Sequence, residues 1–179
     1  MNKYYVSWQD VESHTQEILR QLHQDSWRPD YIVGITRGGL VPANLMSQYL
    51  DVPMHTLKVS LRDDAENGCE SNLWMVEDAY GHREFDPMAS GDGRKNILIV
   101  DDINDSGSTL NWIRQDWQSG CFPNDPRWAE VWNHNVRVAC LYDNQASLNE
   151  IAIDYSAVEV NKLDDPCWIV FPWEDWWQR

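Results

Sequence analysis

The fold is decided by one continuous segment, Ile97-Leu98-Ile99-Val100-Asp101-Asp102-Ile103-Asn104-Asp105-Ser106-Gly107-Ser108-Thr109. Its four leading aliphatic residues predict a buried parallel strand, and two carboxylates stand where that strand ends. A polar turn that contains glycine follows, and residues 110–117 can continue as a helix. A strand that leads through a short turn into a helix is the repeating unit of a mainly parallel α/β sheet.

The same segment predicts a binding site for a phosphate monoester. Free backbone N–H groups gather at the N-terminus of the helix, at the positive end of its dipole. Ser106, Ser108 and Thr109 add hydroxyl donors, and the following helix can start close to the anion. The acidic pair at 101–102 would be a poor phosphate ligand. Such a pair can instead bind vicinal sugar hydroxyls or hold a divalent cation through water. The alternative is an ordinary turn in which Asp and Ser side chains cap the helix.

A second segment, earlier in the chain, repeats the order of strand, turn and helix. Residues 31–35 predict a strand, Thr36-Arg37-Gly38-Gly39 predicts a tight turn, and 40–46 begins a helix with a proline near its first turn. The planar guanidinium of Arg37 can bind two phosphate oxygens at once. An Arg-Gly-Gly turn alone is weak evidence for anion binding. The two loops in this order are stronger evidence together.

Together, these segments resemble the pyrophosphate loop and the signature for phosphoribosyl pyrophosphate (PRPP) of the type I phosphoribosyltransferases. The resemblance implies that Arg37, Gly38 and Gly39 receive the leaving diphosphate. It also implies that Asp101 and Asp102 anchor the ribose hydroxyls and meet Mg²⁺ indirectly, through the ribose or water. The turn that would hold the 5′-phosphate consists of Ser106, Gly107, Ser108 and Thr109.

Two neighbouring positions refine this resemblance. Asp105 is expected to contact PRPP and to act as general acid or base near N7 of a purine, because an acid at this loop position marks the 6-oxopurine branch of the family. A helix-capping aspartate is the alternative for Asp105. Asn104 departs from the family, which usually has an aliphatic residue there. We expect Asn104 to support the loop without touching the ligand.

A third segment, Trp168-Ile169-Val170-Phe171-Pro172-Trp173-Glu174, resembles the base-binding stretch of bacterial xanthine-guanine phosphoribosyltransferases and related enzymes. The resemblance implies that Trp168 stacks on the purine, that backbone groups of Ile169 read the edge of the base, and that Glu174 lies near its exocyclic position. Aromatic stacking is worth ~1–3 kcal/mol for any base. The tryptophans that we assign to packing or to an interface are Trp173, Trp176 and Trp177.

One departure concerns the base. The 6-oxopurine enzymes usually carry a lysine just after the strand that corresponds to 138–142, where it reads the 6-oxo group. This chain has Asp143-Asn144-Gln145 there, and Asn144 aligns best with the lysine. An amide can donate to a carbonyl or accept from an amino group, so Asn144 predicts a base contact with relaxed or redirected selectivity.

The rest of the chain fits a single domain over 1–179, in an α/β class with a mainly parallel sheet flanked by helices. Apolar residues at 11, 15, 18 and 22 predict a first helix, and 54–61 and 136–142 predict further strands. Residues 62–96 are expected to form a flexible flap with a two-stranded hairpin over 73–85. Residues 119–135 look like an insertion at the surface or a subunit contact. The base-binding C-terminal segment, 143–179, would form a small hood.

Composition excludes several classes of protein. The net charge of −15 argues against sequence-independent nucleic-acid binding, which depends on Lys and Arg. Positive potential must therefore be local, through Arg37, Lys58 and Arg62, helix N-termini and bound magnesium. Neither a membrane span of ~20 apolar residues nor a signal sequence is visible, which predicts a cytoplasmic protein. The four cysteines show no paired spacing and predict reduced thiols, and the five scattered histidines predict no zinc site.

The sequence thus predicts a Mg²⁺-dependent purine salvage enzyme that works as a homo-oligomer, a dimer or a tetramer. It would transfer phosphoribose from PRPP to xanthine, guanine or hypoxanthine and release pyrophosphate. Two alternatives stay open: a phosphoribosyltransferase for a non-purine base, and a PRPP-sensing regulatory protein without turnover. Retention of Arg37, Asp101, Asp102 and Asp105 together favours the enzyme.

Overall fold

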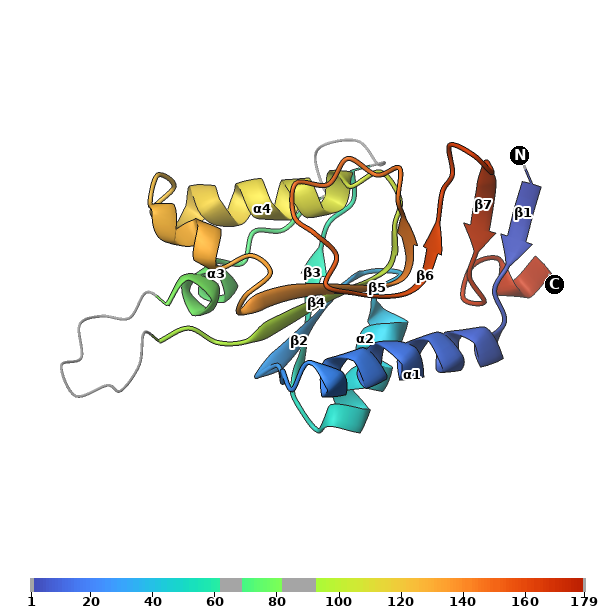
Figure 1. Cartoon of the computed structure of the whole chain (residues 1–179), viewed down its shortest axis with the longest axis horizontal. Helices are drawn as coiled ribbons and strands as arrows, with labels where there is room; N and C mark the ends of the chain where they lie inside the picture. The colour runs from blue at the N-terminus through green and yellow to red at the C-terminus, as the bar shows by residue number, and fades with distance from the viewer. Residues whose placement is uncertain (1, 62–68, 82–92, 179) are drawn as a thin grey trace.

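The computed structural model describes residues 2–61, 69–81 and 93–178, and its centre is a five-stranded parallel sheet (Figure 1). The strands stand in the order β3 (Met54–Lys58), β2 (Tyr31–Thr36), β4 (Ile97–Asn104), β5 (Val136–Asn144) and β6 (Tyr155–Val160). The chain passes from β2 to β3 and then adds β4 on the other side of β2. Strand order therefore reverses between β2 and β4, and open α/β sheets bind ligands at the carboxyl ends of strands beside such a reversal.

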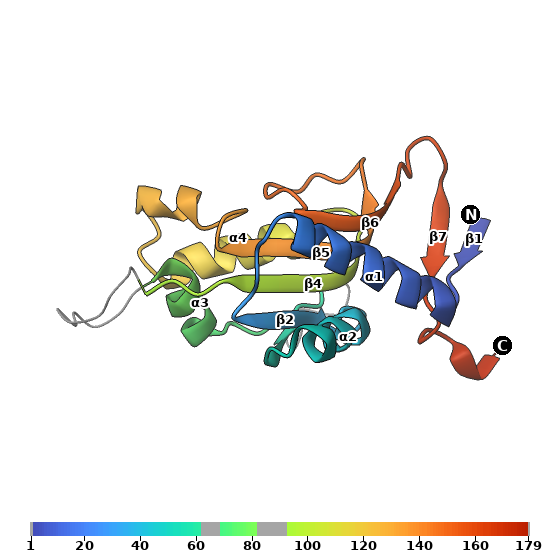
Figure 2. The same ribbon diagram turned by 60° about the horizontal axis from the view of Figure 1, so that its bottom comes forward.

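Helices cover both faces of this sheet, as the sequence predicts. Helices α1 (Trp8–Gln24) and α2 (Leu40–Leu50) lie on one face, and α3 (Leu73–Tyr80) and α4 (Ser108–Gly120) lie on the other (Figures 1 and 2). Helix α1 begins at a capping box between Ser7 and Asp10. It buries the predicted stripe, which consists of Val11, Thr15, Ile18 and Leu22.

Strand β4 shares its side chains between the two faces. Ile97 and Ile99 belong to the apolar cluster under α3 and α4, whereas Leu98 and Val100 belong to the cluster under α1 and α2. Successive side chains of a strand point to opposite faces, and both faces of β4 are covered by helices, so every position of this run is apolar. All four side chains are fully buried. The continuous aliphatic run therefore marks the central strand.

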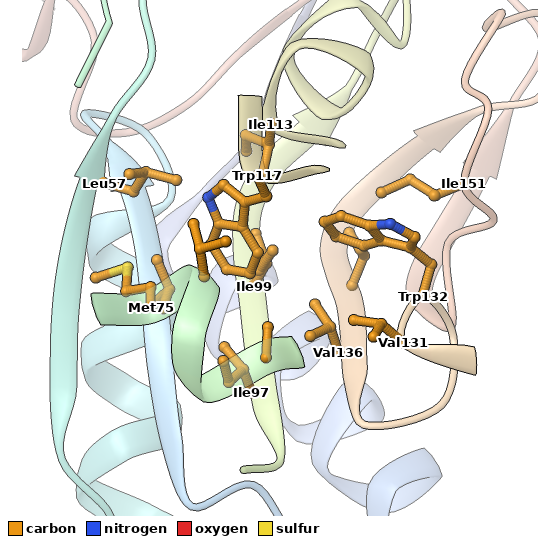
Figure 3. Packing of buried hydrophobic residues seen from close by; sticks show 14 of the residues in the cluster. Leu57, Met75, Ile97, Ile99, Ile113, Trp117, Val131, Trp132, Val136 and Ile151 are labelled. Atoms are coloured by element: carbon orange, nitrogen blue, oxygen red, sulfur yellow. The ribbon is translucent and has the colours of Figure 1, made fainter. Parts of the chain in front are cut away.

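The cluster under α3 and α4 contains two tryptophans, Trp128 and Trp132, from the segment 119–135. Figure 3 shows Trp117 of α4 over β4, with Met75 of α3 on one side, toward Leu57 of β3, and Trp132 on the other. Trp128, in the short helix η1 (Pro126–Glu130), is also buried, and its indole N–H donates to the Cys121 carbonyl at 2.9 Å. Much of 119–135 does lie at the surface, as expected, but Trp128, Val131 and Trp132 reach inward and complete the core. The subunit contact stays a prediction.

The expected hairpin over 73–85 is wrong. Residues Leu73–Tyr80 form helix α3, which buries Met75, Val76, Ala79 and Tyr80. These positions lie on one face of a 3.6-residue repeat, and that spacing does not suit a strand. Gly81 ends the helix with a φ of 82°. The rest of the expected flap includes 62–68 and 82–92, which lie outside the described residues.

A second, two-stranded sheet carries the C-terminal segment. Strand β1 (Asn2–Tyr5) pairs in parallel with β7 (Cys167–Val170), next to η2 (Trp176–Gln178), at the end of the molecule where both termini lie (Figure 1). Phe171 and Trp173 stack with ring centroids 4.9 Å apart. Trp173 thus packs, as expected, whereas the neighbouring tryptophans of η2 are exposed.

The remaining expectations have mixed outcomes. The four cysteines are free thiols, as expected. Among the helices of the described residues, none is both long and apolar enough to cross a membrane. The homo-oligomer and the cytoplasmic location stay predictions.

Candidate active site

The loops after β2 and β4 lie against each other at the reversal of strand order. A Cβ atom on Gly38 would stand 1.9 Å from Oδ2 of Asp102. A Cβ atom on Gly39 would stand 2.3 Å from the Val100 carbonyl oxygen. A side chain at position 38 would displace the Asp102 carboxylate or the loop, and one at position 39 would collide with backbone. The Arg-Gly-Gly turn and the acidic pair, which are remote in sequence, therefore form one surface.

Arg37 is the cation at this surface. Its side chain is exposed, and its carbonyl accepts the backbone N–H of Leu40 at 3.2 Å, at the start of α2. No ion pair holds the guanidinium within the described parts of the chain, so it can receive an anion. Lys58, which is also exposed, ends β3 opposite Thr36 of β2. Arg62, the third expected cation, lies outside the described residues.

The acidic pair ends the buried part of β4. Oδ1 of Asp101 accepts the backbone N–H of Asp102, and Oδ1 of Asp102 accepts that of Ile103, each at 2.9 Å. Burial raises the pKa of Asp102 to about 6. The negative charge of Glu174 adds to this shift, while the hydrogen bonds oppose it. The charge of Asp102 is thus costly before a cation or a sugar hydroxyl arrives.

The donor set at this point suits Mg²⁺ only with help from the substrate. No cluster of three or more His, Cys, Asp or Glu that could hold a metal ion occurs among the described residues. Mg²⁺ is usually bound through one or two carboxylates and substrate phosphates, with several waters retained. The oxygens of Asp101 and Asp102 fit that pattern, and they do not make a closed protein cage.

The polar turn after β4 opens helix α4 toward the same surface. Gly107 is the N-cap residue, with a φ of 84°, and the Ser106 hydroxyl accepts the backbone N–H of Ser108 at 3.3 Å. The N-cap position of α4 is thus held by Gly107 and not by Asp105. The hydroxyls of Ser106 and Ser108 lie 2.9 Å apart, both residues are exposed, and Thr109 is half-buried beside them. Backbone N–H groups and hydroxyl donors thus meet at one helix N-terminus.

Asn104 holds this turn in place, as expected. Its Nδ2 donates to Asp143 at 2.8 Å, to Ser147 at 2.9 Å and to Asn149 at 3.2 Å. The side chain is buried, so an aliphatic residue there would remove these three hydrogen bonds from the interior. The polar residue in place of the family's aliphatic one therefore ties the turn after β4 to the turn after β5.

Lys162, which the sequence analysis did not single out, lies beside Asp105. Its Nζ stands 2.8 Å from Oδ1 of Asp105, and its side chain is only 15% exposed. The residue follows β6, so only the fold brings it to the loop after β4. One signal was present in the sequence, because Lys162 is the only Lys or Arg between positions 138 and 178. An isolated lysine in such an acidic stretch is expected to form an ion pair with one of the carboxylates.

Asn144 lies under that ion pair. It is buried, and its Nδ2 donates to the carbonyl oxygen of Asp105 at 2.8 Å. Its Oδ1 accepts the backbone N–H groups of Ala146 at 3.2 Å and Lys162 at 3.0 Å. Backbone groups thus occupy both ends of the amide that was expected to contact the base.

The C-terminal residues expected at the base have different exposures. Trp168 is 39% exposed, whereas the side chain of Ile169 is buried in the core under α1 and α2. A base contact by Ile169 would therefore have to come from its backbone, as expected. The carboxylate of Glu174 accepts the backbone N–H of Phe171 at 2.9 Å and closes the turn after β7.

Comparison with known proteins assigns this fold and surface to a family. Residues 2–175 match the family described as "Phosphoribosyl transferase domain". The chain belongs to the phosphoribosyltransferase family, and its mainly parallel sheet flanked by helices is the type I fold of that family.

The individual similarities fall in the xanthine-guanine branch. The xanthine-guanine phosphoribosyltransferase of Idiomarina loihiensis is 30% identical over 115 residues, which cover 63% of this chain and 63% of that protein. Xanthine phosphoribosyltransferase 1 of Saccharomyces cerevisiae is 26% identical over 125 residues, 62% of this chain and 57% of that protein. The chain thus spans less than two thirds of the length of both curated relatives. The crystal structure of a purine phosphoribosyltransferase from Pyrococcus horikoshii has 25% identity and a TM-score of 0.63 and covers 98% of this chain and 96% of its own.

Proposed function

We propose that this protein transfers the phosphoribosyl group of PRPP to a 6-oxopurine and releases pyrophosphate. One observation carries the proposal: the near contact of Gly38 with Asp102 unites a diphosphate loop, an acidic pair and a helix N-terminus at one end of β2 and β4. PRPP carries a diphosphate, vicinal hydroxyls and a phosphate monoester in that same order. Similarity to named xanthine-guanine phosphoribosyltransferases supports the choice of base.

The residues divide the substrate between them. The backbone around Ser106 and Ser108 and the hydroxyl of Thr109 bind the 5′-phosphate at the start of α4. Asp101 and Asp102 accept hydrogen bonds from the ribose hydroxyls. Mg²⁺, when bound with the diphosphate beside these carboxylates, supplies positive charge to the leaving group.

The reaction exchanges one bond at the ribose C1 atom. N9 of the base forms its bond to C1 as the bond from C1 to the diphosphate oxygen breaks. Arg37 stabilises the negative charge that develops on the departing pyrophosphate, and such preorganised charge is usually the largest catalytic contribution. Asp105 accepts the proton that the base loses at N7. Trp168 stacks on the ring and holds it over C1.

The test is pyrophosphate release from PRPP with a panel of bases: xanthine, guanine, hypoxanthine, adenine, orotate and nicotinate. We expect release with at least one 6-oxopurine and a requirement for Mg²⁺. Release only with a base that is not a purine would show that this base, and not a 6-oxopurine, accepts the phosphoribosyl group. Tight PRPP binding by calorimetry, with no release for any base, would instead support a regulatory protein.

A further inference from the structure

The environment of Lys162 is unusual for a lysine in an exposed turn. Its neighbours Asn161 and Leu163 are exposed, yet its own side chain is 15% exposed and reaches the Asp105 carboxylate at 2.8 Å. Lysine loses considerable side-chain entropy when it is ordered, and it is seldom enclosed without a partner. The turn after β6 therefore directs one cation at the acid that stands beside the proposed base site.

Asn144 fixes the geometry of this pair through the backbone. Its amide bridges the carbonyl oxygen of Asp105 and the backbone N–H of Lys162, at 2.8 and 3.0 Å. Two loops that follow different strands are thus held at one spacing, independently of the ion pair itself. A pair held in this way is preorganised, so little further ordering is needed when a ligand arrives.

The chemistry of a purine edge matches this pair. N7 and the substituent on C6 lie on the same edge of the ring, and a lysine can reach N7 and O6 of guanine together. Once Asp105 bonds to N7, an ammonium that already touches Asp105 stands beside the C6 substituent. A carbonyl oxygen there accepts from the ammonium, whereas the amino group of adenine presents N–H donors to it.

We propose that Lys162 is a specificity-determining residue, which donates to the oxygen on C6 of the purine and disfavours an amino group at that position. This inference rests on the proposed function, and it moves the reading of the base from Asn144 to a residue after β6. Asn144 then acts as a positioning residue, because its polar atoms are bonded to backbone.

A purely electrostatic role for Lys162 predicts something different. If the ammonium only balanced the charge of Asp105, its removal would change the reaction with every purine to a similar extent. A direct bond to the C6 oxygen changes the ratio between oxo and amino purines. The ratio of kcat/KM for guanine to that for adenine therefore separates the two roles.

The experiment compares Lys162→Gln and Lys162→Met with the wild type on guanine, hypoxanthine and adenine. Lys95→Gln is the matched control, because Lys95 also pairs with an aspartate, Asp78 at 3.2 Å, but precedes β4 at the opposite end of the sheet. A charge-assisted hydrogen bond corresponds to about a ten- to hundredfold effect, so we expect both Lys162 variants to lose that much of the oxo preference. The control should keep it. Thermal unfolding and PRPP affinity verify that each variant is folded.

The outcomes separate the inference from the proposed function. An unchanged guanine-to-adenine ratio in folded Lys162 variants would overturn the role of Lys162 and leave the transferase standing. If the wild type turns over no base, the proposed function fails. Calorimetry with GMP and AMP then decides the inference without turnover: Lys162→Gln must lose a wild-type preference for GMP, and equal loss for both nucleotides, or no wild-type preference, would overturn it.

Discussion

Gly38 and Asp102 approach each other so closely that a single methyl group on Gly38 would collide with the carboxylate, at 1.9 Å from Oδ2. This contact joins the loop after β2 to the loop after β4 across the reversal of strand order. The two loops can therefore bind the two ends of one substrate, because their spacing is fixed by packing. The requirement for glycine here comes from this close approach to Asp102.

The variant Gly38→Ala tests this relationship. The added Cβ must displace Asp102 or the loop, and a displacement of about 1 Å at a reacting centre can cost roughly 10²-fold in rate. We expect a loss of that order in kcat/KM for PRPP, measured by pyrophosphate release. Gly120→Ala is the control, since its Cβ would meet Leu73 at an ordinary 3.9 Å. Equal activity of both variants would show that the loops are not held together as described.

A second prediction concerns the leaving group. Arg37→Ala removes the guanidinium that faces the diphosphate, so PRPP and pyrophosphate should bind more weakly. The nucleoside monophosphate has no diphosphate, and its affinity should hardly change. Calorimetry with the three ligands measures the difference, and Arg20→Ala, which breaks an exposed ion pair with Glu17 on α1, serves as the control. Equal losses for all three ligands would mean that Arg37 supports the loop only.

The proton acceptor gives a third prediction. Asp105→Asn keeps the size of the side chain but cannot take a proton from the base, so turnover should fall by ~10²–10⁴-fold. PRPP binding should stay close to that of the wild type. Asp78→Asn breaks a comparable pair with Lys95 away from the site and should leave turnover unchanged. Full activity in Asp105→Asn would assign the proton to another group.

Residues whose roles follow from a local pattern could be predicted from the sequence, and residues that only the fold brings together could not. The segments around Arg37 and Asp101 carry strand, turn and helix N-terminus within a few residues, so their chemistry could be read directly. The position of Lys162 could not, because the turn after β6 reaches Asp105 only through the sheet. Trp128, within 119–135, is a similar case. The prolines at 123 and 126 indicate a loop, and only the packing under α3 and α4 shows that this loop carries core residues.

The raised pKa of Asp102 gives a prediction about stability and pH. An unfolded aspartate titrates near 3.8, whereas the pKa of Asp102 in the fold is about 6. The folded protein therefore holds this proton more tightly between about pH 4 and 6, and stability is lost as the pH rises through that window. Asp102→Asn should stabilise the unliganded protein by about 1–3 kcal/mol at pH 7.5 and by almost nothing near pH 4.

Chemical denaturation at the two pH values measures this difference. Asp10 supplies a control of opposite sign, because its hydrogen bonds with Ser7 lower the pKa of its carboxyl. Asp10→Asn should therefore be less stable than the wild type at pH 7.5, and this difference should shrink at low pH. A gain for Asp102→Asn that is equal at both pH values would show that burial of its charge is not the cause. The same variant should bind PRPP poorly, as expected where a functional site costs stability.

The last prediction concerns Asn144, whose amide holds the loops that carry Asp105 and Lys162. In Asn144→Ala, the carbonyl of Asp105 and the N–H of Lys162 lose their hydrogen bonds to this buried amide, which should cost about 1–3 kcal/mol of unfolding free energy. Asn161→Ala is the control; its exposed side chain bonds within its own turn, where water can replace it. Because the amide no longer holds Asp105 and Lys162 together, the ratio of kcat/KM for guanine to that for adenine should also fall. A stable, fully selective Asn144→Ala would show that Lys162 and Asp105 find each other without the amide.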